Sequence, residues 1–510
     1  MSVFLPGTPA TAGQWDRRAY LLLALLFLWR LLFILVAPMD LAPDEAYYWD
    51  WSRIPALGYY SKPPMIGWVN MISSALLPVS AFSVRLPAAL FATASLLLFH
   101  ALGKRLFSSR TAFWALAATA ASPGNCVIGY IMTIDAPLLF FWSLAIYCFW
   151  RALADEAEGY RWWLAAGLAA GGGLLSKQMM LAYLVLAVVF LLMSRRDRHH
   201  LATPRPYLMI VLGLAALLPP LWWNMQNDWI TFRHTAHHFE SNPHRLQTLA
   251  DFICGQLLLL SPLTCALFAL LTGSLLYGFA RQGRRVRFLL LFGGTSLVFF
   301  LLMSLRQRIN ANWPAIFYPA GMVLLAAWGC GEVSGGRFLP DRWRRFFVPG
   351  VVVGAVLAVL TYTLPLVLPA TSLGGGRLDP TARIKGWRQL ALSVETVRRE
   401  LPPDEEVFLA SPSRQVVSEL AFYLPDRPRV YMWSGESGVQ SQYDLWAQPD
   451  VGPARDGLVV IEEDGAPLSA SVARSFVTFE KLQELEIALG PAGSRRFSVY
   501  LGRSLTTWRR

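Results

Sequence analysis

The sequence predicts an α-helical polytopic membrane protein with a small, soluble C-terminal α/β domain. Of its 510 residues, 55% are hydrophobic and only 15% are charged, whereas a soluble globular chain carries about 25% charged residues. Apolar runs of roughly 16 to 25 residues recur from Tyr20 to Leu368, long enough to cross a ~30 Å hydrocarbon core. After Pro369, charged residues become common and the apolar runs shrink to the length of a strand.

The apolar runs predict eleven membrane spans, or thirteen if 65–79 or other short segments insert. The first run follows Arg17 and Arg18 but is longer than the apolar part of a signal peptide, and no small-residue cleavage site follows it. We interpret it as an uncleaved signal anchor. The predicted domains are 1–370 and 371–510. The predicted spans are 19–38, 83–102, 111–131, 134–152, 161–175, 177–193, 207–223, 254–279, 288–304, 313–330 and 347–368.

The connections between these spans differ in charge from one side of the membrane to the other. One alternate set carries nineteen Lys and Arg residues and the other carries eight. The positive-inside rule places the richer set in the cytoplasm, together with the N-terminus. The loop after the first span, the loop 224–253 and the C-terminal domain then face outward. The net charge of +12 therefore reflects membrane topology and does not indicate nucleic-acid binding.

In the domain 371–510, apolar and polar residues alternate in short runs typical of strands. The segments "EVFLA", "RVYMW", "GLVVIEE" and "RFSVYLG" predict strands, and "ARIKGWRQLALSVETVRREL" and "SRQVVSELAFYL" predict helices. Strands that alternate with helices predict a small α/β sheet domain.

The first outward loop places acids among aromatic residues. Asp44 and Glu45 follow Pro43, and four aromatic residues stand between positions 47 and 51. Aromatic side chains favour the membrane interface, so the acids are expected at headgroup level. A carboxylate there can serve as a base toward a hydroxyl or ligate a metal. A solvated acidic pair at the membrane boundary is the alternative.

The same loop continues as "GYYSKPPM", where two prolines stiffen the chain after a lysine. Lys62 is expected at the lip of the membrane, as a point charge for a lipid-linked phosphate. Snorkelling or headgroup contact would also explain it. Tyr59 and Tyr60 are candidate substrate contacts.

The loop 224–253 holds four of the seven histidines. If it is helical, His234, His237 and His238 share a face, because they are spaced i, i+3, i+4. A divalent metal site would draw on His237 and His238, although a merely amphipathic segment has the same pattern. Arg245 is a candidate second ligand of a phosphate.

Further polar residues stand at or near the ends of other spans. Asp135 is either a helix cap or a site residue, and Lys177, Arg308 and Asn312 lie on outward turns. Arg30 lies inside the first span, and an arginine within a membrane is rare and functional by default. We expect Arg30 either to bind the donor phosphate or to fill a structural role.

Five segments together resemble a known family. "PDEAYYWDWSRIPALGYYSKPPMIGW", "MTIDAPLLFFWSLAIYCFWRAL", "GLLSKQMMLAYLV", "GQLLLLSPL" and "NANWPAIFYPAGMVLLAA" occur in this order. They resemble bacterial membrane glycosyltransferases of the GT-C fold, the relatives of protein O-mannosyltransferases and of the lipid A aminoarabinose transferase. The resemblance implies an undecaprenyl-type phosphosugar donor, the bacterial inner membrane and transfer on its periplasmic side.

The resemblance also implies roles for single residues. Asp44 matches the essential outer-loop aspartate of the family, Glu45 its neighbour, and Lys62 a lysine that contacts the donor phosphate. In the aminoarabinose branch a glutamate precedes that lysine and shares a metal with a loop histidine. Here Ser61 stands in its place, so metal use and the aminoarabinose assignment both stay open.

The expected function is therefore glycosyl transfer from a polyprenyl-phosphate sugar to an envelope acceptor, namely lipid A or lipopolysaccharide, another glycan, or a protein. The sugar stays open among aminoarabinose, galacturonate, mannose and other hexoses. Two alternatives are a transporter or flippase of lipid-linked substrates, and an envelope scaffold. A transporter would carry ionisable residues near the bilayer midplane in paired repeats, whereas the polar residues here gather on one side.

Overall fold

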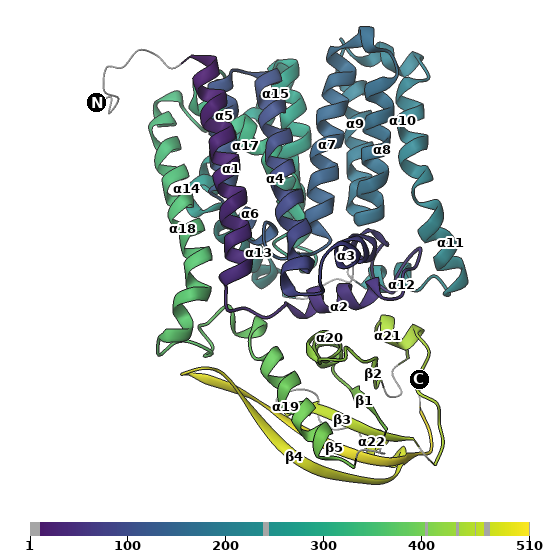
Figure 1. The fold of residues 1–510 in the computed structure, drawn as a ribbon. Helices are drawn as coiled ribbons and strands as arrows, with labels where there is room; N and C mark the ends of the chain where they lie inside the picture. Colours follow the sequence, from purple (N-terminus) through teal and green to yellow (C-terminus); the bar gives the residue numbers. More distant parts are fainter. Residues whose placement is uncertain are drawn as a thin grey trace. The chain divides into compact units, whose positions relative to one another are not determined.

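The computed structural model describes residues 11–237, 244–402, 406–434, 438–453, 455–463 and 470–508. Figure 1 shows the fold, whose residues form two compact units. The first unit comprises Met1–Leu35, Arg85–Trp222 and Thr235–Tyr362. The second comprises Val36–Val84, Trp223–His234 and Thr363–Arg510. The second unit thus draws on three separate parts of the sequence. The division into domains at residue 370 stays a prediction.

The first unit is helical, with long helices that run side by side (Figure 1). Its helices, including those that it shares with the second unit, are α1 (Ala12–Val36), α4 (Ala81–Leu106), α5 (Ser109–Ala120), α6 (Pro123–Ile128), α7 (Asp135–Ala154), α8 (Arg161–Ser176), α9 (Leu181–Met193), α10 (Arg205–Ala215), α11 (Leu218–Gln226), α12 (Ile230–His237), α13 (Arg245–Leu260), α14 (Pro262–Tyr277), α15 (Arg284–Leu289), α16 (Thr295–Ser304), α17 (Tyr318–Gly329) and α18 (Phe347–Val367).

The chain is a multi-pass membrane protein. Among the described residues, six helical segments are long and apolar enough to cross a bilayer, or seven if α13 and α14 count as one bent span. This count lies below the eleven to thirteen predicted, although every predicted span coincides with helical residues. The difference arises because several helices are short or broken. Pro262, for example, starts a new helix, and α13 and α14 meet there at 110°.

Glycines bring α8 and α10 close together. A Cβ on Gly167 would lie 2.8 Å from the carbonyl oxygen of Met209, and one on Gly171 would lie 2.9 Å from the Cβ of Ala216. Small residues on facing helices let the two backbones approach, which is a common device of membrane helices. The packing of these two helices therefore depends on the absence of side chains at two positions.

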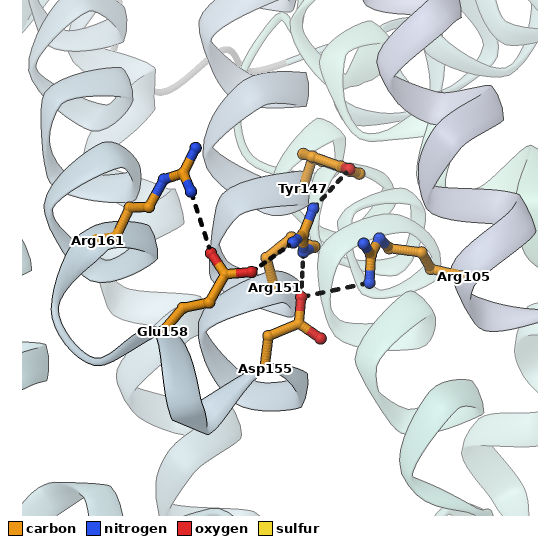
Figure 2. Close-up of polar contacts among 6 residues, drawn as sticks. All are labelled: Arg105, Tyr147, Arg151, Asp155, Glu158 and Arg161. Carbon is orange, nitrogen blue, oxygen red and sulfur yellow. Dashed lines mark hydrogen bonds and ion pairs between the residues drawn. The ribbon is translucent and has the colours of Figure 1, made fainter.

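A charged network ties together the ends of α4, α7 and α8, as Figure 2 shows. Arg151 is at its centre, because it pairs with Asp155 and its Nη2 lies 3.1 Å from Oε1 of Glu158. Its guanidinium also lies 4.0 Å from the ring centroid of Trp162. The members drawn are Arg105, Tyr147, Arg151, Asp155, Glu158 and Arg161. Basic residues that the sequence suggests as topology signals thus also pin helix ends.

The second unit contains a five-stranded sheet in the order β2-β1-β3-β5-β4. β1 pairs in parallel with β2 and β3, β5 runs antiparallel to β3, and β4 and β5 form a hairpin. The elements are α19 (Trp387–Glu400), β1 (Val407–Ser411), α20 (Arg414–Tyr423), β2 (Val430–Met432), α21 (Gln442–Leu445), β3 (Asp456–Glu462), α22 (Ala470–Arg474), β4 (Phe476–Gly490) and β5 (Gly493–Leu505).

The structure confirms the predicted C-terminal α/β fold. The four predicted strands coincide with β1, β2, β3 and β5, and the two predicted helices with α19 and α20. β4 was not predicted. Most of its fifteen residues are exposed or half-buried, so it lacks the run of buried apolar residues that marks β3.

Two further helices, α2 (Pro43–Ser52) and α3 (Met65–Leu76), belong to this second unit. α2 packs against both α20 and α3. The acidic and aromatic segment after the first span is therefore helical in part and packs against the C-terminal part of the chain.

Candidate active site

The two adjacent acids at the start of α2 have different surroundings. Pro43 occupies the first turn, where proline is favoured because its missing N–H would have no partner there. Glu45 is fully buried, and its Oε2 accepts the N–H of Ala42 at 2.8 Å. Glu45 thus closes the helix start. The burial and the bond of Glu45 indicate a structural role. The side chain of Asp44, by contrast, is 55% exposed.

Asp44 pairs with an arginine from the far end of the chain. Nη2 of Arg414, the first residue of α20, lies 2.9 Å from Oδ1 of Asp44. The Arg414 guanidinium also lies over the ring of Tyr47, at 4.6 Å from its centroid. Burial by itself would lower the pKa of Arg414, but the charge and hydrogen bond of Asp44, together with Tyr47 and Tyr48, more than compensate and raise it.

Hydrogen bonds hold the start of α2 against α20. The hydroxyl of Ser418 donates to the carbonyl of Pro43 at 3.3 Å. The hydroxyl of Tyr423 accepts the N–H of Leu41 at 2.7 Å. Because both bonds involve backbone atoms within three residues of Asp44, they fix the start of the helix that carries it.

A stacked aromatic pair supports the loop after α2. Trp51 and Tyr59 stack with ring centroids 4.4 Å apart, and the Tyr59 hydroxyl donates to the carbonyl of Trp51 at 3.1 Å. Burial raises the pKa of Tyr59 to about 12. A Cβ on Gly67 would lie 2.7 Å from the Tyr59 hydroxyl, so only glycine fits there. The structure therefore gives Tyr59 a supporting place in the core.

The segment Trp223–His234 closes over the same loop. The hydroxyl of Thr231 donates to the carbonyl of Tyr59 at 2.9 Å, and the rings of Tyr60 and His234 lie 4.8 Å apart. Lys62 is half-buried in this loop, and its carbonyl accepts the N–H of Tyr59 at 3.1 Å. Tyr60, Lys62 and part of the histidine-containing loop thus belong to one compact unit.

A second polar cluster lies in the first unit and joins three predicted residues. Nζ of Lys177 lies 2.9 Å from Oδ1 of Asp135, and the amide of Asn312 donates to Oδ2 of Asp135 at 2.6 Å. The hydroxyl of Thr133 accepts the N–H of Asp135 at 3.3 Å, and among the described residues the Asp135 carboxylate makes no capping bond at the start of α7. The Asp135 carboxylate can therefore bind both the ammonium of Lys177 and the amide of Asn312.

The other predicted phosphate and metal ligands are placed only in part. Arg245 is the exposed first residue of α13, and Arg308 is exposed on the turn after α16. His237 ends α12, but its side chain, like the whole of His238, lies outside the described residues. A metal held by these two histidines therefore stays a prediction.

Arg30 is fully buried in α1 and linked to two other helices. Nη1 donates to the hydroxyl of Thr93 at 2.9 Å, and Nη2 donates to Oδ1 of Asn125 at 2.7 Å. A Cβ on Gly129 would lie 2.4 Å from Nε. Of the two roles that the sequence left open for Arg30, this geometry favours the structural one.

Among the described residues, one group has the side chains for a metal site, namely Glu156, His199 and His200, with ligand atoms within 4.8 Å of one another. Burial, the neighbouring His199 and Arg205 lower the pKa of His200, against the opposing charges of Glu156 and Asp197. Two of the three side chains, Glu156 and His199, are exposed, and exposed acidic groups commonly hold no ion, so we assign no metal to this group.

Sequence reasoning missed Arg414. A signal was present, because a basic residue in the first turn of a helix opposes the helix dipole and needs a compensating partner. Ser413 caps α20 through its hydroxyl, which confirms that the next residue begins the helix. The partner, Asp44, lies 370 positions earlier in the sequence. No local pattern could connect the two residues.

Comparisons with known proteins agree with this architecture. A family model described as dolichyl-phosphate-mannose-protein mannosyltransferase matches residues 61–223. That stretch includes Lys62, Asp135 and Lys177. The lipid A galacturonosyltransferase RgtD of Rhizobium johnstonii is 29% identical over 432 residues, which are 84% of this chain and 87% of that protein.

Solved structures show the fold. ArnT from Cupriavidus metallidurans in the apo state has a TM-score of 0.64 at 18% identity, covering 96% of this chain and 98% of that chain. Its complex with undecaprenyl phosphate has a TM-score of 0.63 at the same identity and coverage. The oligosaccharyltransferase AglB from Archaeoglobus fulgidus has a TM-score of 0.51 at 12% identity, covering 82% of this chain and 64% of that chain. The chain is therefore a membrane glycosyltransferase with the GT-C fold.

Proposed function

We propose that this glycosyltransferase moves a sugar from a polyprenyl-phosphate donor to an envelope acceptor, with lipid A as the acceptor class to test first. The similarity to a lipid A galacturonosyltransferase over 84% of the chain supports the acceptor class. The likeness in fold to ArnT, which was solved with undecaprenyl phosphate, supports the donor class. Other glycans and proteins remain the alternative acceptors.

The observation that carries the proposal is the exposed carboxylate of Asp44, held by Arg414 at the start of a helix that is itself fixed. A general base needs an accessible oxygen in a defined position. In the described part of the chain, Oδ1 of Asp44 is bound to Arg414 and Oδ2 accepts no hydrogen bond. Oδ2 is the oxygen open to an acceptor.

The proposed reaction is a direct displacement. The acceptor oxygen attacks the anomeric carbon, the bond from that carbon to the donor phosphate oxygen breaks, and polyprenyl phosphate leaves. A hydroxyl acceptor passes its proton to Asp44, whereas an acceptor phosphate needs little general base. The displacement inverts the anomeric centre. Fixed cations that stabilise the departing phosphate contribute the largest share of such catalysis.

Lys62 and Arg245 are the proposed ligands of the donor phosphate. Lys62 lies in a loop stiffened by two prolines and by the stack of Trp51 on Tyr59. Tyr60, in the same loop, is a proposed sugar contact. Asp135, Lys177 and Asn312 form a preassembled polar cluster, and with Arg308 they are proposed substrate contacts.

We further propose that the protein lies in the bacterial inner membrane, with a cytoplasmic N-terminus and a periplasmic C-terminal domain. The nineteen basic residues on one set of connections, against eight on the other, support this orientation. A periplasmic site would meet lipid-linked sugars and envelope glycolipids on the same side of the membrane.

The test is transfer by purified protein in detergent. Undecaprenyl phosphate carrying galacturonate or aminoarabinose is offered with lipid A, and mass spectrometry detects the modified lipid. We expect transfer by the wild type with one of these donors, and a loss of about 10²- to 10⁴-fold in Asp44→Asn.

Asp426→Asn is the matched control, because it neutralises another aspartate that pairs with an arginine in the second unit. It should leave transfer unchanged. Normal transfer by a folded Asp44→Asn protein would refute the role of Asp44. Movement of the lipid-linked sugar across vesicles without sugar transfer would support a flippase instead.

A further inference from the structure

We propose that Arg414 is a positioning residue for catalysis, which makes the C-terminal part of the chain a component of the active site. The proposal rests on the proposed function of Asp44. It adds that the orientation of the Asp44 carboxylate, and hence the rate of transfer, depends on a residue of the sheet-containing unit.

The geometry around Arg414 differs from that of an ordinary surface ion pair. Exposed pairs usually contribute about 0–1 kcal/mol, because two long side chains lose freedom when they meet. Here the guanidinium is held on two sides, by Oδ1 of Asp44 at 2.9 Å and by the ring of Tyr47 at 4.6 Å. Its side chain is only 31% exposed. Much of its freedom is therefore already restricted by packing.

The ring beneath Arg414 is itself fixed. The hydroxyl of Tyr47 accepts the N–H of Gln442 at 2.6 Å, and its ring meets Trp51 edge-on with centroids 4.8 Å apart. Tyr47 is almost fully buried. The stacking surface therefore holds the plane of the guanidinium in place.

The backbones that carry the pair are also joined. Ser418 donates to the carbonyl of Pro43, next to Asp44, and Ser418 itself is fully buried. Asp44 and Arg414 both lie in the first turn of their helices, where the backbone is defined by capping. The Asp44 carboxylate is thus held by a partner whose own position is set by its surroundings.

The chemical consequence concerns the second oxygen of Asp44. A charge-assisted bond from an arginine to Oδ1 fixes the rotation of the carboxylate, and with it the position of Oδ2. Without that bond the carboxylate can rotate, and a misplacement of about 1 Å can cost on the order of 10²-fold in rate. Lysine can restore the charge but not the planar stacking on Tyr47, so it should restore activity only in part.

The experiment compares Arg414→Ala, Arg414→Lys and wild type in the transfer assay. For Arg414→Ala we expect kcat to fall by about 10- to 100-fold with the KM for the lipid-linked donor little changed. Arg414→Lys should recover part of the loss. Added guanidinium at millimolar concentration should raise the rate of Arg414→Ala but not that of wild type, because a free cation can occupy the vacated place.

Arg398→Ala is the matched control, since Arg398 pairs with Asp426 at 2.7 Å in the same unit. Arg398→Ala should keep wild-type activity, and added guanidinium should not raise its rate. Thermal unfolding of each variant separates positioning from folding, and Arg414→Lys covers the case in which Arg414→Ala does not fold.

Two results keep this inference and the proposed function apart. If Asp44→Asn is inactive but Arg414→Ala transfers as wild type does, the positioning role is refuted and the function of Asp44 stands. If Asp44→Asn transfers sugar as wild type does, the role of Asp44 fails, and the positioning role of Arg414 with it. The proposed function fails only if the wild type transfers no sugar from these donors. Once Asp44 is Asn, removal of Arg414 as well should cost nothing further; an additional loss would show that Arg414 acts on something other than Asp44.

Discussion

Asp44 and Asp135 differ in how their carboxylate oxygens are occupied. Asp135 is nearly buried, and both of its oxygens are bound, one to Lys177 and one to Asn312. Asp44 is half exposed and has one oxygen bound to Arg414. An acid with both oxygens taken is suited to hold a cation or a neighbour in place, and an acid with one free oxygen is suited to accept a proton.

The Asp135 pair should matter for stability as well. In Lys177→Ala, a carboxylate whose side chain is only 9% exposed loses its cation. Removal of one partner from a buried pair costs about 3–5 kcal/mol. We expect a clearly lower unfolding temperature in detergent, with partial recovery in Lys177→Ala/Asp135→Asn.

Lys481→Ala serves as the control for this experiment. Lys481 pairs with Glu484 on the surface, where the side chains are 36% and 73% exposed. The Lys481→Ala substitution should not change the unfolding temperature measurably. Equal shifts for both lysine variants would contradict the buried character of the Asp135 pair.

Asp379 gives a pH dependence of stability. Burial would raise its pKa, but hydrogen bonds from Lys385, Thr381 and the N–H of Gly375 lower the pKa well below the usual range. A group whose pKa is lower in the folded state stabilises the fold above its unfolded pKa of about 3.9, and this contribution disappears as the pH falls toward the folded value.

We therefore expect Asp379→Asn to be less stable than wild type at pH 7, because it leaves Lys385 buried without its counter-charge. The difference should shrink only below about pH 4. Urea unfolding in detergent across this pH range measures it. A difference that is constant down to about pH 3 would show that the charge of Asp379 is not the cause.

At the scale of elements, the positions of the membrane helices were predictable, but not their number as full spans, because burial in lipid demands apolar runs and these are visible in the sequence. The breaks within them were less visible. Leu290–Gly294 forms a π-helical turn between α15 and α16, and no residue pattern predicted this turn. β4 was missed because a strand with few buried residues shows little hydrophobic signal.

The candidate site divides in the same way. Asp44, Lys62, Asp135, Lys177 and Asn312 are candidates because polar residues beside membrane spans are unusual and stand out, and their roles stay predictions. What the sequence could not supply is the pairing of residues that lie far apart. The capping role of Glu45 was not predictable either, because the sequence near a helix start does not distinguish a capping glutamate from a catalytic one.

Packing of α8 against α10 gives a prediction at this scale. Gly167→Ala would bring a Cβ to 2.8 Å from the carbonyl oxygen of Met209, a backbone atom that cannot move aside easily. We expect a loss of about 1–3 kcal/mol, read as a lower unfolding temperature.

Gly273→Ala is the control, because nothing lies within 4 Å of the position that its Cβ would take in α14. It should be neutral or stabilise by up to about 1 kcal/mol through helix propensity. If both glycine variants behave alike, the close approach of α8 and α10 is not a determinant of stability.

For the whole molecule, the proposed orientation can be tested by labelling. In a Cys254→Ala background, which removes the exposed native cysteine, single cysteines replace Val477 in β4 or Arg161 at the start of α8. Both positions are well exposed, at 68% for Val477 and 73% for the side chain of Arg161.

A maleimide that does not cross membranes should label Val477→Cys but not Arg161→Cys in intact spheroplasts, and both after lysis. The physical reason is the excess of basic residues on the connections at the Arg161 side. The reverse pattern would place the C-terminal domain in the cytoplasm and remove the proposed periplasmic site.

The second unit is assembled from three distant parts of the sequence, and Asp44 and its arginine stand 370 positions apart. At about 5–20 residues per second, a ribosome needs roughly 20–75 s to travel between the two codons. During that interval the nascent chain contains Asp44 but not yet Arg414. A truncated chain that ends before Arg414 would keep Asp44 without this partner. Only full-length molecules should therefore use the lipid-linked sugar at the full rate.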